Sequence, residues 1–161
     1  MTTATYVSFR PLKVSDSEHV SNLLLNSSFE YVRYFHPFDS DVLSIRNQLD
    51  AATNDKYFGI ELDDLGLNGP NLVGFYMLRG LDEGYLDPMY GVFIAQHWCN
   101  MGIARLSLYH AECFCKINSY KRLLLKVNIA NYKAKSLYKS FGFKADREDA
   151  KNGNIVLIKN L

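Results

Sequence analysis

The stretch NIANYKAKSLYKSFGF, residues 128–143, carries most of the information about the fold of this 161-residue chain. Asn131 precedes an apolar run with helical spacing, and asparagine at such a position accepts a hydrogen bond from the helix's first turn. Gly142 can adopt the left-handed conformation that commonly ends a helix. The apolar residues between them share one helical face: Ala134, Leu137, Tyr138 and Phe141. The stretch therefore predicts a helix from Asn131 to Phe141 and a strand that begins at Phe143.

A second stretch, residues 90–105, predicts a strand, a polar link and the start of another helix. Tyr90 to Ile94 is a short apolar run, typical of a strand that is buried on both faces. The sequence MGIAR, residues 101–105, then opens a helix whose first turn offers unpaired N–H groups and part of a positive charge. Small residues there let a phosphate approach the backbone, so the segment is a candidate anion site. It lacks the dinucleotide fingerprint G-x-G-x-x-G.

The other elements follow from periodicity and turn signals. Two helices are expected after the first strand, one at the capping-box pattern Ser15 to Glu18 and one beginning at Asp39 or Ser40. Further strands are expected at Tyr6–Arg10, Tyr57–Leu62, Leu72–Leu78, Arg122–Val127, Phe143–Arg147 and Asn154–Lys159. This order of strands and helices predicts one α+β domain, residues 1–161, with a mixed sheet that helices cover.

Composition narrows the classes of function. The net charge is +1, without the basic excess of nucleic-acid binders, and no apolar run approaches the roughly 20 residues that cross a bilayer. We therefore expect neither nucleic acid nor membrane as a partner. Three cysteines, Cys99, Cys113 and Cys115, occur without a secretion signal, which favours reduced thiols and a cytoplasmic location. Cys113 and Cys115 have no companion ligands at metal-binding spacing, so no metal is expected.

Three motifs together resemble the GNAT superfamily, the Gcn5-related N-acetyltransferases. The 128–143 stretch resembles the family's second signature through these residues: Asn131, Ala134, Leu137-Tyr138 and Gly142-Phe143. Cys99 to Ala104 resembles the family's pyrophosphate loop, Q/R-x-x-G-x-G/A. The opening Phe9 to Leu12, followed by Asp16, resembles the family's first strand and helix start. The resemblance covers nearly the whole chain, with the elements in the same order.

This resemblance implies a fold and an activity. The fold would be a single GNAT-like domain, with a central, mixed, mostly antiparallel and twisted sheet of about seven strands flanked by four helices. The activity would be that of an acetyl-CoA-dependent N-acetyltransferase, in which a primary amine of a small molecule, an aminosugar among the candidates, attacks the thioester directly. The alternatives are a protein or peptide acceptor, and a non-catalytic acyl-CoA-binding or interaction module. A monomer and a homodimer are both compatible with the resemblance.

The resemblance also assigns residues to acetyl-CoA. The backbone of Phe93, Ile94 and Ala95 would pair with the pantetheine arm, and Asn131 would hydrogen-bond that arm. Backbone N–H groups of Gly102, Ile103, Ala104 and Arg105 would cradle the pyrophosphate, with Lys133 and Lys135 near the nucleotide phosphates. Tyr138 would be the general acid for the departing thiolate; packing on the buried helix face is its structural alternative. Cys99 and Gln96 depart from the family pattern, which bears on cofactor affinity.

The general base and the acceptor site are expected near the sheet's fourth strand. Asp87 and Glu83 lie in the loop before it and are the candidate bases, with a solvated surface position as the alternative for each. Glu61, and Tyr85 or Tyr90 acting through water, are further options. Acceptors in the family meet the loop between the first two helices, where an aromatic group occurs: Tyr31, Tyr34, Phe35 and His36. A ring-lined pocket would suit an aminosugar face, an aromatic amine or an apolar peptide end.

Overall fold

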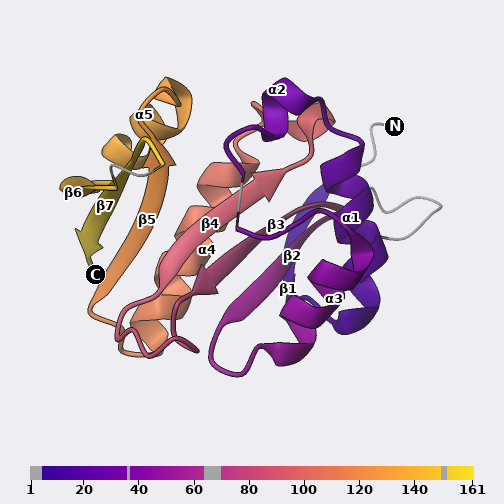
Figure 1. The fold of residues 1–161 in the computed structure, drawn as a ribbon, viewed down its shortest axis with the longest axis horizontal. Coiled ribbons are helices and arrows are strands. Elements are labelled where there is room, and N and C mark those ends of the chain that lie inside the picture. The colour runs from indigo at the N-terminus through magenta and orange to yellow at the C-terminus, as the bar shows by residue number, and fades with distance from the viewer. Residues whose placement is uncertain (1–4, 36, 64–69, 150–151) are drawn as a thin grey trace.

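A single seven-stranded sheet forms the centre of the computed structural model, which describes residues 5–35, 37–63, 70–149 and 152–161 (Figure 1). The spatial order is β1-β2-β3-β4-β5-β7-β6, and every neighbouring pair is antiparallel except β4 and β5. The strands are β1 (Tyr6–Pro11), β2 (Lys56–Asp63), β3 (Asn71–Arg79), β4 (Met89–Ile94), β5 (Arg122–Asn128), β6 (Lys144–Asp149) and β7 (Asn154–Asn160). The predicted α+β class with a mixed, mostly antiparallel sheet is confirmed.

Helices accompany the sheet on both faces. In the described residues they are α1 (Ser17–Leu25), α2 (Phe29–Val32), α3 (Val42–Ala51), α4 (Ile103–Ile117) and α5 (Tyr132–Ser140), with two 3-10 turns, η1 (Val14–Asp16) and η2 (Gln96–Trp98). The number exceeds the predicted four because α2 is only four residues long, too short to show a helical period in the sequence. Asp41, rather than the expected Asp39 or Ser40, caps α3, and its carboxylate accepts the Ser44 N–H at 2.9 Å.

Of the three buried clusters in the described residues, two divide most of the core between the faces of the sheet, and a third joins Ile60, Leu62, Val73, Ile94 and Ile103. One cluster lies under α1 and α3: Val20, Leu24, Ile45, Tyr57, Phe75, Met77 and Phe93. The other lies under α4 and α5 and includes Tyr76, Leu78, Tyr90, Leu108, Ala111, Cys115, Leu123, Leu125, Tyr138 and Phe141. Consecutive strand residues point to opposite faces, so Phe75 and Tyr76 belong to different clusters. This is why β3 and β4 are apolar almost throughout.

The turn before α1 is held by an ion pair rather than by the predicted capping box. Asp16, not Ser15, is the anchoring residue: its carboxylate accepts the Lys13 N–H at 2.7 Å. The Arg10 guanidinium from β1 donates to both Asp16 oxygens, at 2.7 and 2.9 Å. These hydrogen bonds lower the pKa of Asp16, which is buried and charged. The expected pairing of Ser15 with Glu18 is therefore wrong. Asp16 takes the position before α1, where the charged Arg10 guanidinium is a stronger hydrogen-bond donor than a neutral group.

The feature that shapes the functional site is the divergence of β4 from β5. The two parallel strands pair only at Met89 with Leu124 and at Tyr90 with Leu125. β4 continues to Ile94 while staying paired with β3, and β5 turns away from it (Figure 1). We call the Met89 side the closed end of β4 and the Ile94 side its open end. Toward β5, the backbone of the open end has no paired strand.

Candidate active site

At the open end of β4, the backbone N–H and carbonyl groups of successive residues point alternately toward β3 and toward the side where β5 diverges. The Ala95 N–H donates to the Val73 carbonyl at 2.8 Å, and the Ala95 carbonyl accepts the Trp98 N–H at 2.8 Å. Since the polar groups of successive strand residues point in opposite directions, Phe93 also directs its groups to β3. Val92 and Ile94 direct theirs away from β3. Of the three residues predicted to pair with pantetheine, the structure therefore brings only the backbone of Ile94 to the open side.

Val92 also presents its backbone N–H and carbonyl on the open side of β4, and the sequence-based prediction omitted it. The strand register pairs it with Tyr76, one position from the Phe75–Phe93 pair, so its N–H and carbonyl face the same side as those of Ile94. The signal was available in the two-residue period of a strand, but it could be used only once the register was known. The Ile94 carbonyl already accepts the Tyr31 hydroxyl at 2.6 Å.

The start of α4 forms the candidate anion cradle, which we define as the backbone from Gly102 to Arg105. The first hydrogen bond of this helix runs from the Leu106 N–H to the Gly102 carbonyl at 3.1 Å, so the preceding N–H groups have no acceptor within the helix. Gly102 has φ of 83°, and a Cβ built there would meet nothing within 4 Å. The position therefore combines a left-handed backbone with open space, as the close approach of a phosphate requires.

The start of α5 lies against the loop that leads into this cradle. The Lys133 ammonium donates to the side-chain carbonyl of Asn100, a residue with φ of 67°. The side-chain carbonyl of Asn131 caps α5 by accepting the Ala134 N–H at 3.2 Å, as the sequence predicts. Its amide NH₂ is the part that can donate to a bound molecule. Lys133 is thus brought to the cradle, whereas the Lys135 ammonium bonds the Ile129 carbonyl at 3.1 Å.

Tyr138 lies on the buried side of α5, close to the point where β4 and β5 part. It is 7% exposed, and its ring makes edge contacts with Tyr90 and Phe143 at centroid distances of 6.4 and 6.0 Å. Burial raises the pKa of Tyr138 to about 12. Its hydroxyl is consequently protonated at neutral pH and can act as a hydrogen-bond donor. The ring of Tyr138 can therefore pack against its aromatic neighbours while its hydroxyl donates a hydrogen bond.

Aromatic residues around α2 border the opposite side of the open end. Tyr31 bonds the Ile94 carbonyl, and its ring stands edge-on to Phe93 at 5.9 Å. Phe35 contacts Phe93 at 5.3 Å. Burial, and then the neighbouring Cys99, raise the pKa of Tyr31 to about 12. Tyr34 instead lies under the Arg33 guanidinium at 4.7 Å, away from these contacts.

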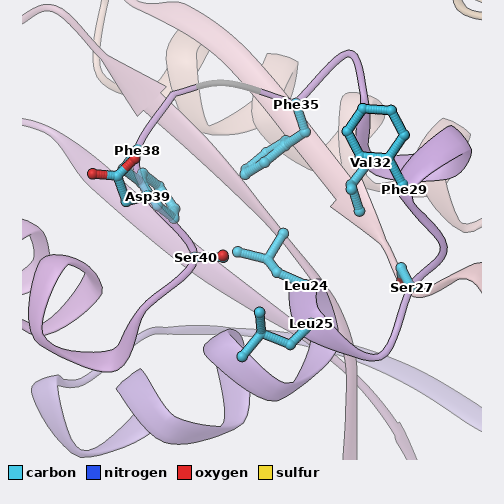
Figure 2. A pocket seen from close by; sticks show the side chains of 9 residues that line it. All are labelled: Leu24, Leu25, Ser27, Phe29, Val32, Phe35, Phe38, Asp39 and Ser40. Atoms are coloured by element: carbon cyan, nitrogen blue, oxygen red, sulfur yellow. The ribbon is translucent and has the colours of Figure 1, made fainter.

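A pocket of about 510 Å³ opens beside these rings. Figure 2 shows its lining residues, which we call the acceptor pocket: Leu24, Leu25, Ser27, Phe29, Val32, Phe35, Phe38, Asp39 and Ser40. Six of the nine are apolar, and one carries a charge. Phe29 and Leu25 are 77% and 63% exposed, so the pocket has an apolar rim that faces solvent. Of the predicted acceptor residues, Phe35 lines the pocket, and His36 lies outside the described residues.

Comparison with known proteins identifies the family. The sequence profile of the acetyltransferase (GNAT) family matches residues 23–143, which is three quarters of the chain. The chain belongs to the acetyltransferase (GNAT) family. Enzymes of this family are acyltransferases that use acetyl-CoA as the donor, which agrees with the exposed strand edge and the anion cradle. No curated protein sequence matches the chain.

Solved structures of similar fold extend over the whole chain. A domain from Methanocaldococcus jannaschii DSM 2661 has a TM-score of 0.82 and 18% identity, with 98% of this chain and 100% of that one covered. PaiA N-acetyltransferase from Thermoplasma acidophilum, in complex with coenzyme A, has a TM-score of 0.77 and 16% identity, with 97% and 99% covered. Spermidine N-acetyltransferase from Vibrio cholerae, in complex with CoA and spermine, has a TM-score of 0.76 and 20% identity, with 96% and 95% covered. At these identities the likeness is one of fold.

The two predicted bases of this acetyltransferase lie at the closed end of β4. The Asp87 carboxylate accepts hydrogen bonds from the Arg122 backbone at 3.2 Å and from its guanidinium at 2.7 Å. Glu83 is exposed in the loop before β4. Seven residues of extended chain, about 20 Å, separate Asp87 from Ile94. The structure does not bring Asp87 or Glu83 to the open end, because the loop between β3 and β4 lies at the opposite end of these strands.

The other suggested bases are also committed elsewhere. Glu61, on β2, accepts the Arg10 Nε–H at 2.7 Å. Tyr85 is exposed in the loop with Glu83. Tyr90 is buried, and its hydroxyl bonds Ser107 at 2.7 Å. Of these three candidates only Glu61 carries a carboxylate, and that carboxylate is paired with Arg10.

In residues 5–35, 37–63, 70–149 and 152–161, no three His, Cys, Asp or Glu side chains come together as metal ligands. None of the helices described is long and apolar enough to cross a membrane.

Proposed function

We propose that this acetyltransferase transfers the acetyl group of acetyl-CoA to a primary amine of a small molecule by direct attack. The observation that carries the proposal is the divergence of β4 from β5, with the anion cradle on one side and the acceptor pocket on the other. A thioester lying along the open end would have its phosphates at α4 and its acetyl group within reach of the α2 side. Such an arrangement holds two reactants together, which can contribute several kcal/mol to lowering the barrier.

The donor would be held largely by backbone groups. Val92 and Ile94 offer polar groups on the unpaired strand edge, and the cradle offers N–H groups with a partial positive charge. Lys133, already against the loop before α4, adds a full positive charge for the phosphates. Because most of these contacts come from backbone, the departures at Cys99 and Gln96 remove side-chain contacts without removing the cradle.

The chemistry requires a neutral amine, a stabilised oxyanion and a departing thiolate. The amine nitrogen attacks the thioester carbon, the C–S bond breaks, and the ammonium proton leaves to solvent. The Ile94 N–H, on the open edge, is suited to the oxyanion. Complete proton transfer from Tyr138, with a pKa of about 12, to a thiolate of ordinary pKa near 8.5 costs about 5 kcal/mol. Tyr138 would therefore stabilise the thiolate by donating a hydrogen bond.

The acceptor pocket favours an amine with an apolar body. Its carboxylate is Asp39 alone, which suits a polyamine poorly, since such a substrate carries several positive charges. An aminosugar would bury several hydroxyls, and the pocket offers them few free partners: the Ser27 hydroxyl donates to the Leu23 carbonyl, and the Ser40 carbonyl accepts from Ser21. An aryl or alkyl amine would instead cover Phe29 and Leu25.

A two-stage experiment tests this function. Acetyl-CoA should raise the unfolding midpoint of the purified protein, since a ligand at a hundredfold excess over its Kd adds about 2.7 kcal/mol of stability. Acetylation should then be measured with 2-phenylethylamine, glucosamine and spermidine as acceptors. We expect kcat/KM to be highest for 2-phenylethylamine. Absence of acetyl-CoA binding would refute the donor site, and preference for glucosamine or spermidine would refute the acceptor class alone.

A further inference from the structure

A buried hydroxyl chain connects the point where β4 and β5 part with the anion cradle. Tyr90 is the last β4 residue that pairs with β5, and it is 3% exposed. Its hydroxyl lies 2.7 Å from the Ser107 hydroxyl on the second turn of α4. Ser107 is fully buried and donates to the Ala104 carbonyl at 2.8 Å. Ala104 is part of the cradle, so three residues join the strand to the phosphate-binding backbone.

The direction of this chain follows from counting protons. Ser107 has one hydroxyl hydrogen, which it gives to the Ala104 carbonyl. Tyr90 must therefore be the donor to Ser107. The two bonds both point toward the first turn of α4, a turn whose N–H groups have no acceptor within the helix.

We propose that Tyr90 is a positioning residue that holds the first turn of α4 in the orientation that binds the donor's pyrophosphate. This inference rests on the function proposed above. The Tyr90 ring also contacts Tyr138 edge-on, but that contact belongs to the ring and not to the hydroxyl. Replacing Tyr90 by phenylalanine therefore tests the cradle while it keeps the ring contact with Tyr138.

The chain offers a matched control for the loss of a buried tyrosine hydroxyl. Tyr76 lies on β3 with no exposed surface, and its hydroxyl bonds the His110 ring on the third turn of α4 at 2.6 Å. Tyr76→Phe removes a bond of the same kind between the sheet and the same helix. It leaves the cradle untouched, because His110 lies well beyond the first turn. A purely structural role would give Tyr90→Phe and Tyr76→Phe the same consequences.

The experiment compares acetyl-CoA with S-acetylpantetheine, which has the thioester but no pyrophosphate. For Tyr90→Phe we expect kcat/KM with acetyl-CoA to fall, and its Kd to rise, about fivefold, the change that one ordinary hydrogen bond produces in an equilibrium constant. The kcat/KM with S-acetylpantetheine should stay within twofold of wild type. Tyr76→Phe should change neither donor's constant by more than twofold.

A second pair of variants guards against a simple folding defect. Ser107→Ala leaves the Tyr90 hydroxyl buried without an acceptor and should lower the unfolding midpoint. In the double variant Tyr90→Phe, Ser107→Ala no orphaned group remains, so the midpoint should recover while the acetyl-CoA Kd stays raised. Equal losses with both donors, or recovery of affinity together with stability, would overturn the inference. Wild-type protein that does not bind acetyl-CoA would remove the proposed function and this inference with it.

Discussion

The two ends of β4 differ in what holds them. At the closed end, Met89 and Tyr90 pair with β3 on one side and β5 on the other, and Asp87 ties the preceding loop to Arg122. At the open end, Ile94 pairs with β3 and accepts one hydrogen bond from Tyr31, while the edge toward β5 is free of a strand. One strand is thus paired on both sides at Met89 and Tyr90, and it leaves the edge of its remaining residues toward β5 without a paired strand.

This difference separates polar groups that hold the fold together from those that the proposed function uses. Carboxylates gather at the closed end, where they form hydrogen bonds with loops: Asp82 accepts from Thr53 and Asn54, and Asp87 from Arg122. The open end instead presents backbone groups, the start of a helix and a protonated tyrosine. Variants at the open end should therefore change binding and rate, and variants at the closed end should change stability.

The largest effect is expected from Tyr138→Phe. Removing the hydroxyl takes away the hydrogen bond to the departing thiolate, and one preorganised donor to a developing negative charge contributes on the order of a hundredfold or more. We expect kcat to fall about a hundredfold, with the Kd of acetyl-CoA within threefold of wild type. Steady-state kinetics and calorimetry measure the two quantities. A kcat within threefold of wild type would leave Tyr138 with a packing role only.

Tyr138 should also make the protein sensitive to base. Its folded pKa of about 12 lies above the ordinary value of 10, so its contribution to stability is complete below pH 10 and is lost as the pH rises through 12. At pH 11.5 the wild type should have lost about 2 kcal/mol more unfolding free energy than Tyr138→Phe, relative to pH 8. Denaturant unfolding of both proteins at the two pH values measures this. Equal losses would mean that the Tyr138 hydroxyl is not desolvated.

The variants Gly102→Ala and Gly84→Ala compare the two ends directly, because Gly84 lies in the loop at the closed end and has the same backbone conformation as Gly102. Both glycines have left-handed backbones, with φ of 83° and 89°, and a Cβ at either would meet nothing within 4 Å. Each substitution should cost about 1 kcal/mol of stability through backbone strain. Gly102→Ala places a methyl group where the phosphate approaches, so the Kd of acetyl-CoA should rise about tenfold, and Gly84→Ala should leave it unchanged. Equal Kd values for the two variants would argue against the cradle.

Local signals allowed much of the fold to be predicted from the sequence. The Asn131 cap, the apolar face of α5 and the left-handed Gly142 all depend on residues within one helix, and the structure contains each of them. The strands were found from composition and period in the same way. The start of α4 was also recognisable, because Gly102 and Ala104 lie close together in the chain.

The sequence pattern was insufficient where the deciding partner lies in another element of the fold. Arg10 makes Asp16 an anchor from six residues away in another element, and Arg122 engages Asp87 from 35 residues away. Neither partner can be assigned from the local pattern, so a capping box was predicted at Ser15, and the contacts of Asp87, a candidate base, were not foreseen. The direction in which the backbone groups of Phe93 and Ala95 point was missed for another reason: it depends on strand register, which the two-residue period of a sequence does not give.

The smallest effect is expected from Asp87→Asn, which tests whether the closed end takes part in catalysis. The substitution weakens the bonds to Arg122, whose guanidinium is half exposed, so the loss should be about 1 kcal/mol of unfolding free energy. Because Asp87 lies about 20 Å along the strand from Ile94, kcat/KM and its pH profile should stay within twofold of wild type. Glu83→Gln, in the same loop but exposed, is the control and should change neither stability nor rate. Loss of the acidic limb of the pH profile in Asp87→Asn alone would instead make that carboxylate the base and join the two ends of β4 in one site.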